Sequence, residues 1–446
     1  MLESLKSRIP VASLGLVLFA TIGGILAFWQ KVPCRFGGAW NYGDQQFARL
    51  CYTDIYPLYF GRGMVDGKVP YLEHEMEYPV GIGMFMHFVA ELVRPLADHP
   101  AGRAVLFFDV TVIVMAVCLI IGTLAMSFLA GPARRWDAVW YAISPAVVLT
   151  AYINWDLLVG AIVLVGLVAW ARGQQVVAGV LLGLAIATKF YPVVLLGPLL
   201  VLTIRTGKWR ALGVTAGAAA AAWLAVNLPI MLTDFKGWAR FYEFSAERGV
   251  DWGSIWFYFT RKAWPVLGDP ESLDTIGIVS LAVLCLAIAV LVLTAPRRPR
   301  FMQVCFLVVA AFMLTNKVWS PQYVLWLVPF AVLARPRWPA LAVWMATEIW
   351  YFVAIWRYLL AQQTDSPLAV QGISEDLYFT AVGGRALAVV LLMALVVWDI
   401  LRPASDIVRR DGVDDPSGGV FAGAPDRFLL RVRPRSQTPD LVPKNT

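Results

Sequence analysis

Five polar residues that interrupt or adjoin apolar runs are the first candidates for chemistry in this chain. They are Asp54, Asn154, Asp156, Lys189 and Lys317. An ionisable side chain left unpaired in hydrocarbon is costly, so at the end of an apolar segment it is expected to face a partner or a shared cavity. A carboxylate can act there as a general base, and lysines beside helix ends can bind a phosphate. We therefore expect these residues to share one site.

Asp54 is the preferred general base. The sequence CYTDIYPLYF places one carboxylate in an apolar and aromatic stretch. Such surroundings raise the pKa of a carboxyl group and suit it to proton transfer. The alternative is a structural role, in which Asp54 caps a helix or pairs with Arg49 or Arg62.

Lys189 and Lys317 each follow one apolar run and precede a proline that begins the next. A lysine at that depth can simply extend its ammonium group to the membrane interface. The adjoining helix N-termini also favour anions, so both lysines could instead bind the phosphate of a lipid. Asn154 and Asp156, in AYINWDLLVG, could orient a sugar hydroxyl or pair with one of the lysines.

A metal site is not expected. The sequence EHEME at 73–77 contains residue types that bind metals, but no histidine pair four residues apart and no Asp-x-Asp signature accompanies it. We interpret this segment as a solvated acidic loop. His87 and His99 stand alone and receive no role, and no cofactor is expected.

The elements that must position these residues are apolar. The 446 residues are 59% hydrophobic and 15% charged, with 19 Trp and a mean hydropathy of +0.67. This composition predicts an all-α polytopic membrane protein. Apolar segments suited to crossing a hydrocarbon core of ~30 Å number about twelve. They lie at 11–29, 103–130, 138–152, 157–171, 175–188, 190–204, 210–230, 276–295, 301–315, 320–334, 338–355 and 381–401.

Basic residues then set the direction of the chain, because cytoplasmic loops carry an excess of Lys and Arg. Lys6 and Arg8 place the N-terminus in the cytoplasm, and twelve crossings bring every later basic cluster to the same side. Those clusters are Arg134 with Arg135, Arg172, Arg205 with Lys208 and Arg210, Arg297 with Arg298 and Arg300, and Arg335 with Arg337. The net charge of +7 is explained in this way and needs no nucleic-acid partner.

Two segments complicate the count of crossings. Residues 79–97 would invert every later loop if they crossed the membrane, so we expect a juxtamembrane or re-entrant helix there. The first apolar segment resembles a signal peptide, but no small-residue cleavage site follows at Ala27 to Lys31, so we expect a retained helix.

Under this topology residues 1–402 form one membrane domain with two large extracytoplasmic loops, at about 30–78 and 231–275. Cys34 and Cys51 lie in the first loop, on the oxidising side, where a disulfide is possible. Residues 403–446 are rich in Pro, Asp, Gly, Arg and Ser, which predicts a disordered cytoplasmic tail.

The second loop carries several charged residues among many aromatic ones. They include Asp234, Lys236, Arg240, Glu243, Glu247, Arg248 and Asp251. We attribute most of them to packing at the membrane surface.

Taken together, these residues resemble the GT-C superfamily of polytopic glycosyltransferases, and more narrowly the glycosyltransferase family 87 mannosyltransferases of actinobacterial envelopes. The resemblance covers about residues 10–400 and rests on the order of short motifs. These are CYTDIYPLYF with Asp54, a PY…EYP stretch (Pro70, Tyr71, Glu77, Tyr78, Pro79), an N-x-D turn (Asn154, Asp156), KFYP with Lys189, and KVWSPQYVLW with Lys317. The last motif is the most specific.

The resemblance implies a GT-C-like fold and a polyprenyl-phosphate-linked sugar donor, usually mannose, used on the extracytoplasmic face of the bacterial plasma membrane. Asp54 would deprotonate an acceptor hydroxyl for in-line attack at the anomeric carbon, with inversion. Lys189 and Lys317, with Gln322 and Tyr323 as nearby donors, would hold the charge of the departing lipid phosphate. Neither a metal nor a general acid is required.

By the same resemblance, further polar residues of these motifs would bind the substrate. They are Glu77, Tyr78, Asn154 and Asp156. The acceptor would be a glycolipid or glycan of the envelope, and membrane lipids are the other expected partners. The sequence fixes neither the acceptor nor mannose over another polyprenyl-linked sugar.

Two other classes of protein remain open at this point. A flippase or transporter for lipid-linked sugars would also have about twelve helices, but it would place its charges near the bilayer midplane and show related halves. The sequence has no convincing internal repeat, and its notable charges lie at helix ends. A non-catalytic assembly protein is the third alternative.

Overall fold

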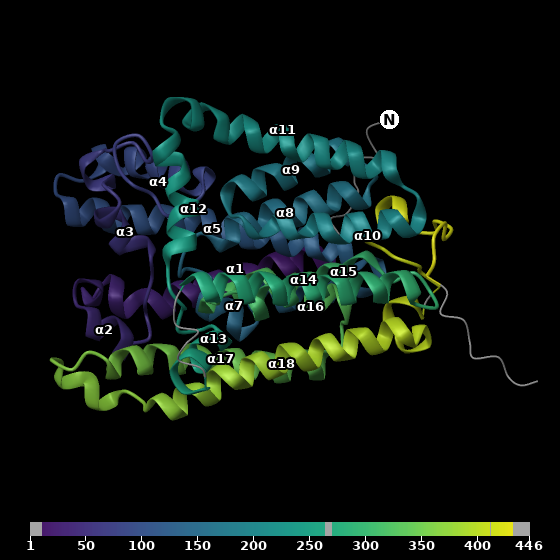
Figure 1. Cartoon of the computed structure of the whole chain (residues 1–446). Helices are drawn as coiled ribbons and strands as arrows, with labels where there is room; N and C mark the ends of the chain where they lie inside the picture. Colours follow the sequence, from purple (N-terminus) through teal and green to yellow (C-terminus); the bar gives the residue numbers. More distant parts are fainter. Residues whose placement is uncertain (1–10, 264–269, 411, 431–446) are drawn as a thin grey trace, which may run out of the picture.

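The structure is a computed structural model that describes residues 11–263, 270–410 and 412–430. Helices make up nearly all of its regular structure (Figure 1). Within the described residues, six helices are long and apolar enough to cross a membrane. They are α1 (Val11–Arg35), α5 (Pro100–Ala130), α11 (Trp209–Thr233), α14 (Pro270–Thr294), α17 (Trp338–Ala361) and α18 (Glu375–Leu401). The chain is therefore a multi-pass membrane protein.

Shorter apolar helices fill the space between these six. They are α8 (Asp156–Ala171), α9 (Gln175–Thr188), α10 (Leu196–Thr206), α15 (Phe301–Thr315) and α16 (Val324–Ala334). The apolar segment predicted at 138–152 is divided into α6 (Val139–Ile143) and α7 (Pro145–Thr150). Ser144 is extended between them, because a residue that precedes proline disfavours the helical conformation.

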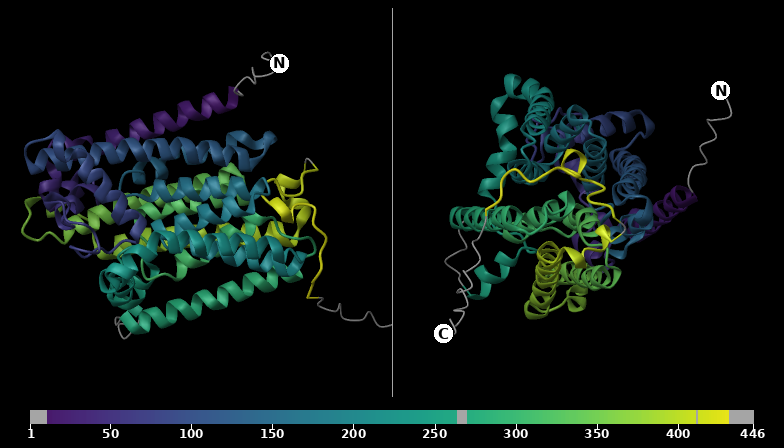
Figure 2. Two further views of the ribbon diagram at one scale, coloured as in Figure 1. Left: turned by 90° about the horizontal axis from the view of Figure 1, so that it is seen from above. Right: turned by 90° about the vertical axis from the view of Figure 1, so that its right-hand side faces the viewer.

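The long helices lie side by side, and the connecting segments gather at the two ends of the bundle (Figures 1 and 2). One end carries several short helices, and we call it the cavity end. These helices include α2 (Gly43–Ala48), α3 (Ile55–Gly61), α4 (Val80–Val93), α12 (Phe235–Glu247) and α13 (Ile255–Tyr258). The opposite end, which we call the tail end, carries residues 403–410 and 412–430, which we call the tail segment.

Helix α4 lies where the sequence predicted a juxtamembrane or re-entrant helix. It has 14 residues, fewer than the ~20 that a crossing requires. Helix α12 lies across the long helices at the cavity end rather than along them (Figure 1). The helix is amphipathic, with aromatic residues on one face and charged residues on another, as expected for a helix that lies at a membrane interface.

The arginine clusters that the sequence assigned to one side do share the tail end. Arg134 donates to the carbonyl of Pro336 at 3.0 Å, which joins two of the predicted cytoplasmic loops. Arg335 pairs with Asp399 at 2.9 Å, at the C-terminal end of α18. Arg205, at the end of α10, pairs with Asp426 at 2.7 Å.

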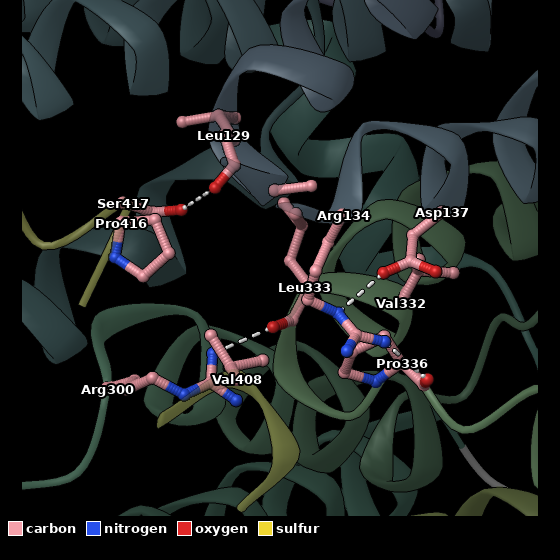
Figure 3. Close-up of a pocket in the computed structure, with 11 residues that line it drawn as sticks. Leu129, Arg134, Asp137, Arg300, Val332, Leu333, Pro336, Val408, Pro416 and Ser417 are labelled. Atoms are coloured by element: carbon pink, nitrogen blue, oxygen red, sulfur yellow. Dashed lines mark hydrogen bonds and ion pairs between the residues drawn. The ribbon is translucent and has the colours of Figure 1, made fainter. Parts of the chain in front are cut away.

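The tail segment is folded against these helix ends, so the predicted disorder of 403–446 is wrong for its first part. Asp406 pairs with Arg300 at 2.8 Å, and both side chains are buried. Asp415 accepts the backbone N–H of Phe301 at 2.7 Å, and Ser417 donates to the carbonyl of Leu129 at 2.8 Å. Figure 3 shows Ser417 of this segment beside Leu129, with Val408 near Arg300.

The physical reason is charge pairing. The composition of the tail is typical of disorder, but its aspartates meet arginines that would otherwise be buried without partners at the helix ends. The ring of Phe421 adds an apolar contact and packs 5.2 Å from that of Trp170. Residues 431–446 lie outside the described residues.

Candidate active site

A cavity of about 560 Å³ opens at the cavity end, between the first loop, α12 and the ends of α9, α15 and α16. It contains most of the residues that the sequence singled out. The predicted residues that line it are Asp54, Glu77, Tyr78, Asn154, Lys189, Lys317, Gln322 and Tyr323. Asp156 lies behind this lining, where it is buried.

The backbone around Asp54 is fixed from several directions. The N–H of Asp54 donates to the carbonyl of Ile153 at 2.7 Å, and the Thr53 hydroxyl donates to that of Tyr152 at 2.8 Å. A disulfide joins Cys34, near the end of α1, to Cys51. The Asp54 carboxylate is therefore held at a defined place on the cavity wall.

The structural roles considered for Asp54 are not observed. Asp54 immediately precedes α3, but its side chain makes no capping hydrogen bond to that helix. Arg49 donates to the carbonyl of Pro33 instead, and Arg62 pairs with Glu77. The carboxylate of Asp54 is thus free of both structural roles and faces the cavity.

Two neighbours orient the Asp54 carboxylate. The Tyr52 hydroxyl donates to Oδ1 at 2.6 Å, and the Asn154 amide donates to Oδ2 at 3.3 Å. Burial raises the pKa of Asp54 above its ordinary value, and the hydrogen bonds from Tyr52 and Asn154 oppose this rise. Within the described part of the chain, Oδ1 of Asn154 is buried without a hydrogen-bond partner, so it can accept a hydrogen bond from a ligand.

Lys189 is held by Asp156 at the floor of the cavity. Its ammonium group lies 2.6 Å from Oδ1 of Asp156, and the Trp326 indole donates to the same oxygen at 2.6 Å. The ammonium group also lies 5.3 Å and 5.5 Å from the ring centres of Trp326 and Tyr323. Of the two roles left open for Asp156, pairing with a lysine is the one observed.

Lys317 occupies another part of the wall, between α12 and α14. Its ammonium group lies 2.7 Å from Asp274 of α14 and donates to the carbonyl of Ala246 of α12 at 2.9 Å. Gln322 is buried nearby, and its side-chain oxygen has no hydrogen-bond partner among the described residues. Both lysines are therefore paired with a carboxylate.

Arg248 and Asp251 also line this cavity, and sequence reasoning missed both. Arg248 directly follows α12, and its closest carboxylate in the described structure is Asp251, at 4.0 Å. Asp251 is held by its N–H, which donates to the carbonyl of Lys317 at 2.9 Å, and burial raises its pKa. Their only sequence signal was charge in an aromatic loop, which also fits packing at a membrane surface.

A buried ion pair supports the KVWSPQY segment of this wall from behind. Arg385 of α18 lies 3.2 Å from Glu348 of α17 and donates to the carbonyl of Trp319 at 3.1 Å. Its guanidinium group also packs on the rings of Trp319 and Tyr351, at 4.2 Å and 3.9 Å from their centres. Because Trp319 lies between Lys317 and Ser320, this contact positions the backbone that carries the cavity residues.

Comparison with known proteins gives one family. The family model described as Glycosyltransferase family 87 matches residues 87–316, slightly more than half of the 446 residues. The match includes Asn154, Lys189 and Arg248 but ends before Lys317, and Asp54 precedes it. No curated protein matches the chain significantly.

Proposed function

The chain belongs to glycosyltransferase family 87, and on that premise we propose that it transfers mannose from a polyprenyl-phosphate donor to a hydroxyl group of an envelope glycolipid or glycan. The reaction takes place on the extracytoplasmic face of the bacterial plasma membrane. The observation that carries the proposal is the cavity in which the Asp54 carboxylate lies among the cations Lys189, Lys317 and Arg248.

In this proposal Asp54 is the general base. It removes the proton of the acceptor hydroxyl, whose oxygen then attacks the anomeric carbon of the donor from the side opposite the phosphate. The bond between that carbon and the phosphate oxygen breaks, and the electron pair leaves with polyprenyl phosphate. The product has the inverted anomeric configuration. Tyr52 and Asn154 hold the carboxylate in place for proton transfer.

The cations of the cavity hold the phosphate. The leaving group is a phosphate monoester and a weak base, so it needs stabilisation of negative charge rather than a general acid. Asp156 and Asp274 already compensate Lys189 and Lys317. Within the described structure Arg248 has no such close partner, and its guanidinium group can bind two phosphate oxygens, so it is the strongest candidate for the donor phosphate.

Two observations favour this proposal over a flippase. The Cys34–Cys51 disulfide lies at the cavity end, which supports placing that end on the oxidising side of the membrane. The candidate groups also gather at one end of the helices, whereas a transporter would place coupling charges near the bilayer midplane. Separately from these two observations, aromatic side chains that include Tyr78 and Trp252 line the cavity, and a sugar can stack on their rings.

The experiment that tests the proposed donor uses purified wild-type protein with a crude envelope-lipid fraction as acceptor. Polyprenyl-phosphate mannose, polyprenyl-phosphate glucose and nucleotide-linked mannose are compared as radiolabelled donors. The proposal predicts transfer from polyprenyl-phosphate mannose alone, with an inverted product linkage by NMR. Transfer from the nucleotide sugar, or a retained configuration, would contradict it. Movement of intact donor across vesicles without transfer would favour the flippase.

A further inference from the structure

A second large cavity lies at the tail end, far from the proposed active site. Its volume is about 750 Å³, and we call it the tail groove. Helices α5 and α8 form its walls, and Ser13 of α1 and Pro416 of the tail segment border it. None of the proposed catalytic or donor-binding residues lines it, so the proposed reaction does not account for this groove.

The walls of the tail groove are apolar and open toward the lipid. Ile121, Leu124 and Phe128 of α5 face Val165 and Val168 of α8 across it. Ile121 and Phe128 are 41% and 44% exposed. Ile121, Leu124 and Phe128 are spaced three and four residues apart, which places them on one face of α5, so the groove continues a membrane-facing stripe. Such a surface accommodates hydrocarbon chains.

Two arginines at the mouth of the tail groove lack carboxylate partners among the described residues. Arg135 and Arg172 both line it, and neither forms an ion pair with any carboxylate that the structure describes. The guanidinium group of Arg172 packs 4.6 Å from the ring centre of Phe128. By contrast, Arg134 and Arg300 at the same end each pair with an aspartate. The tail groove therefore combines apolar walls with positive charge that no carboxylate in the described part of the chain compensates.

We propose that the tail groove binds one anionic phospholipid from the adjoining membrane leaflet. Its phosphate lies between Arg135 and Arg172, where guanidinium groups can bind the phosphate oxygens, and its acyl chains lie along α5 and α8. A zwitterionic lipid is a poorer ligand, because its ammonium group would approach two uncompensated guanidinium groups. This proposal does not depend on the sugar-transfer reaction.

The test measures the lipid that the protein retains. Full-length protein is equilibrated with vesicles of phosphatidylglycerol and phosphatidylcholine, purified in mild detergent, and analysed by native mass spectrometry. We expect wild type to retain one phosphatidylglycerol. Arg135→Gln and Arg172→Gln should each weaken retention by roughly fivefold, from about 1 kcal/mol for each arginine near a membrane surface.

Arg210→Gln is the matched control. Arg210 is an exposed arginine in the first turn of α11, on the predicted cytoplasmic side, and it does not line the tail groove. It should therefore leave retention unchanged. Equal retention of the two lipids by wild type, or an equal loss in all three variants, would overturn the proposal, since either result means nonspecific attraction to the membrane.

A variant in the apolar wall tests the site independently, in case the arginine variants do not fold. Leu124→Trp fills the tail groove and leaves both arginines in place. It should remove the retained phosphatidylglycerol while sugar transfer at the opposite end stays at the wild-type rate. Retention of the lipid by a folded Leu124→Trp protein would exclude the groove as its site.

Discussion

At the scale of single residues, two opposing effects act on the pKa of the Asp54 carboxyl group. Burial raises its pKa, whereas the Tyr52 hydroxyl and the Asn154 amide favour the charged form. A general base must be deprotonated, so the rate of transfer should fall as the pH drops below the raised pKa. Tyr52→Phe removes one opposing hydrogen bond and should raise that pKa further. The acid limb of kcat/KM would then move to higher pH; an unchanged limb would contradict the assignment.

The three cavity cations differ in how fully they are compensated. Lys317 pairs with Asp274 at 2.7 Å, whereas the closest carboxylate to Arg248 in the described structure lies at 4.0 Å. Arg248→Gln should therefore weaken donor binding about 10- to 100-fold, from the ~1.5–3 kcal/mol of a hydrogen bond to a charged group. Lys317→Gln should cost less affinity and more thermal stability, because it leaves Asp274 unpaired. Donor titrations and melting curves measure both effects; the opposite order would exclude Arg248 as the main phosphate ligand.

At the scale of elements, the ion pair between α17 and α18 positions the KVWSPQY segment. Arg385→Gln leaves Glu348 buried without its partner and should destabilise the protein by about 3–5 kcal/mol. The double variant Glu348→Gln with Arg385→Met should recover most of the melting temperature but not kcat, because the contact to the Trp319 carbonyl stays lost. Recovery of kcat together with stability would mean that Arg385 has only a structural role.

The disulfide acts on the loop that carries Asp54. Cys34 and Cys51 tie the end of α1 to a residue three positions before Asp54. Replacing both with serine should lower stability by about 3 kcal/mol, as expected for closing a loop of this length. The rate of transfer should fall as well, since the base is less well held. The Cys118→Ser variant, which changes a buried free thiol, is the control; equal rates in both variants would contradict the positioning role.

At the scale of the whole molecule, the tail segment closes the end opposite the cavity. Asp406 is buried against Arg300, so Asp406→Asn should lower stability by about 3–5 kcal/mol by leaving that guanidinium group uncompensated. Asp98→Asn changes an exposed aspartate and should have little effect. Thermal unfolding of both variants in detergent measures the difference. Equal melting temperatures would show that the tail segment does not stabilise the helix ends.

Much of this arrangement could be predicted from the sequence, because it depends on local pattern. The lengths of the apolar segments predicted the helices, and the positions of the arginines predicted that the loops carrying them lie at one end of the bundle. Lys189 and Asn154 were found because each interrupts an apolar run. Arg248 and Asp251 were missed, since a charge in an aromatic loop becomes informative only when the fold brings it against Lys317.

The tail segment differs from its prediction for a related reason. Its composition is typical of disordered chains, but its order comes from partners far away in the sequence. Asp406 meets Arg300, and Ser417 meets the carbonyl of Leu129. The composition of a segment indicates how much apolar surface the segment can bury by itself. It does not indicate whether arginines elsewhere in the chain will form ion pairs with that segment.

The most direct test of the central claim is sugar transfer from polyprenyl-phosphate mannose by Asp54→Asn, compared with wild type and with Asp66→Asn. Asp66 is an exposed aspartate of the same loop and serves as the matched control. If Asp54 is the base, its asparagine variant binds the donor lipid and melts like wild type but loses transfer by at least ~100-fold, while Asp66→Asn keeps it. Transfer by a folded Asp54→Asn protein at near the wild-type rate would contradict the account.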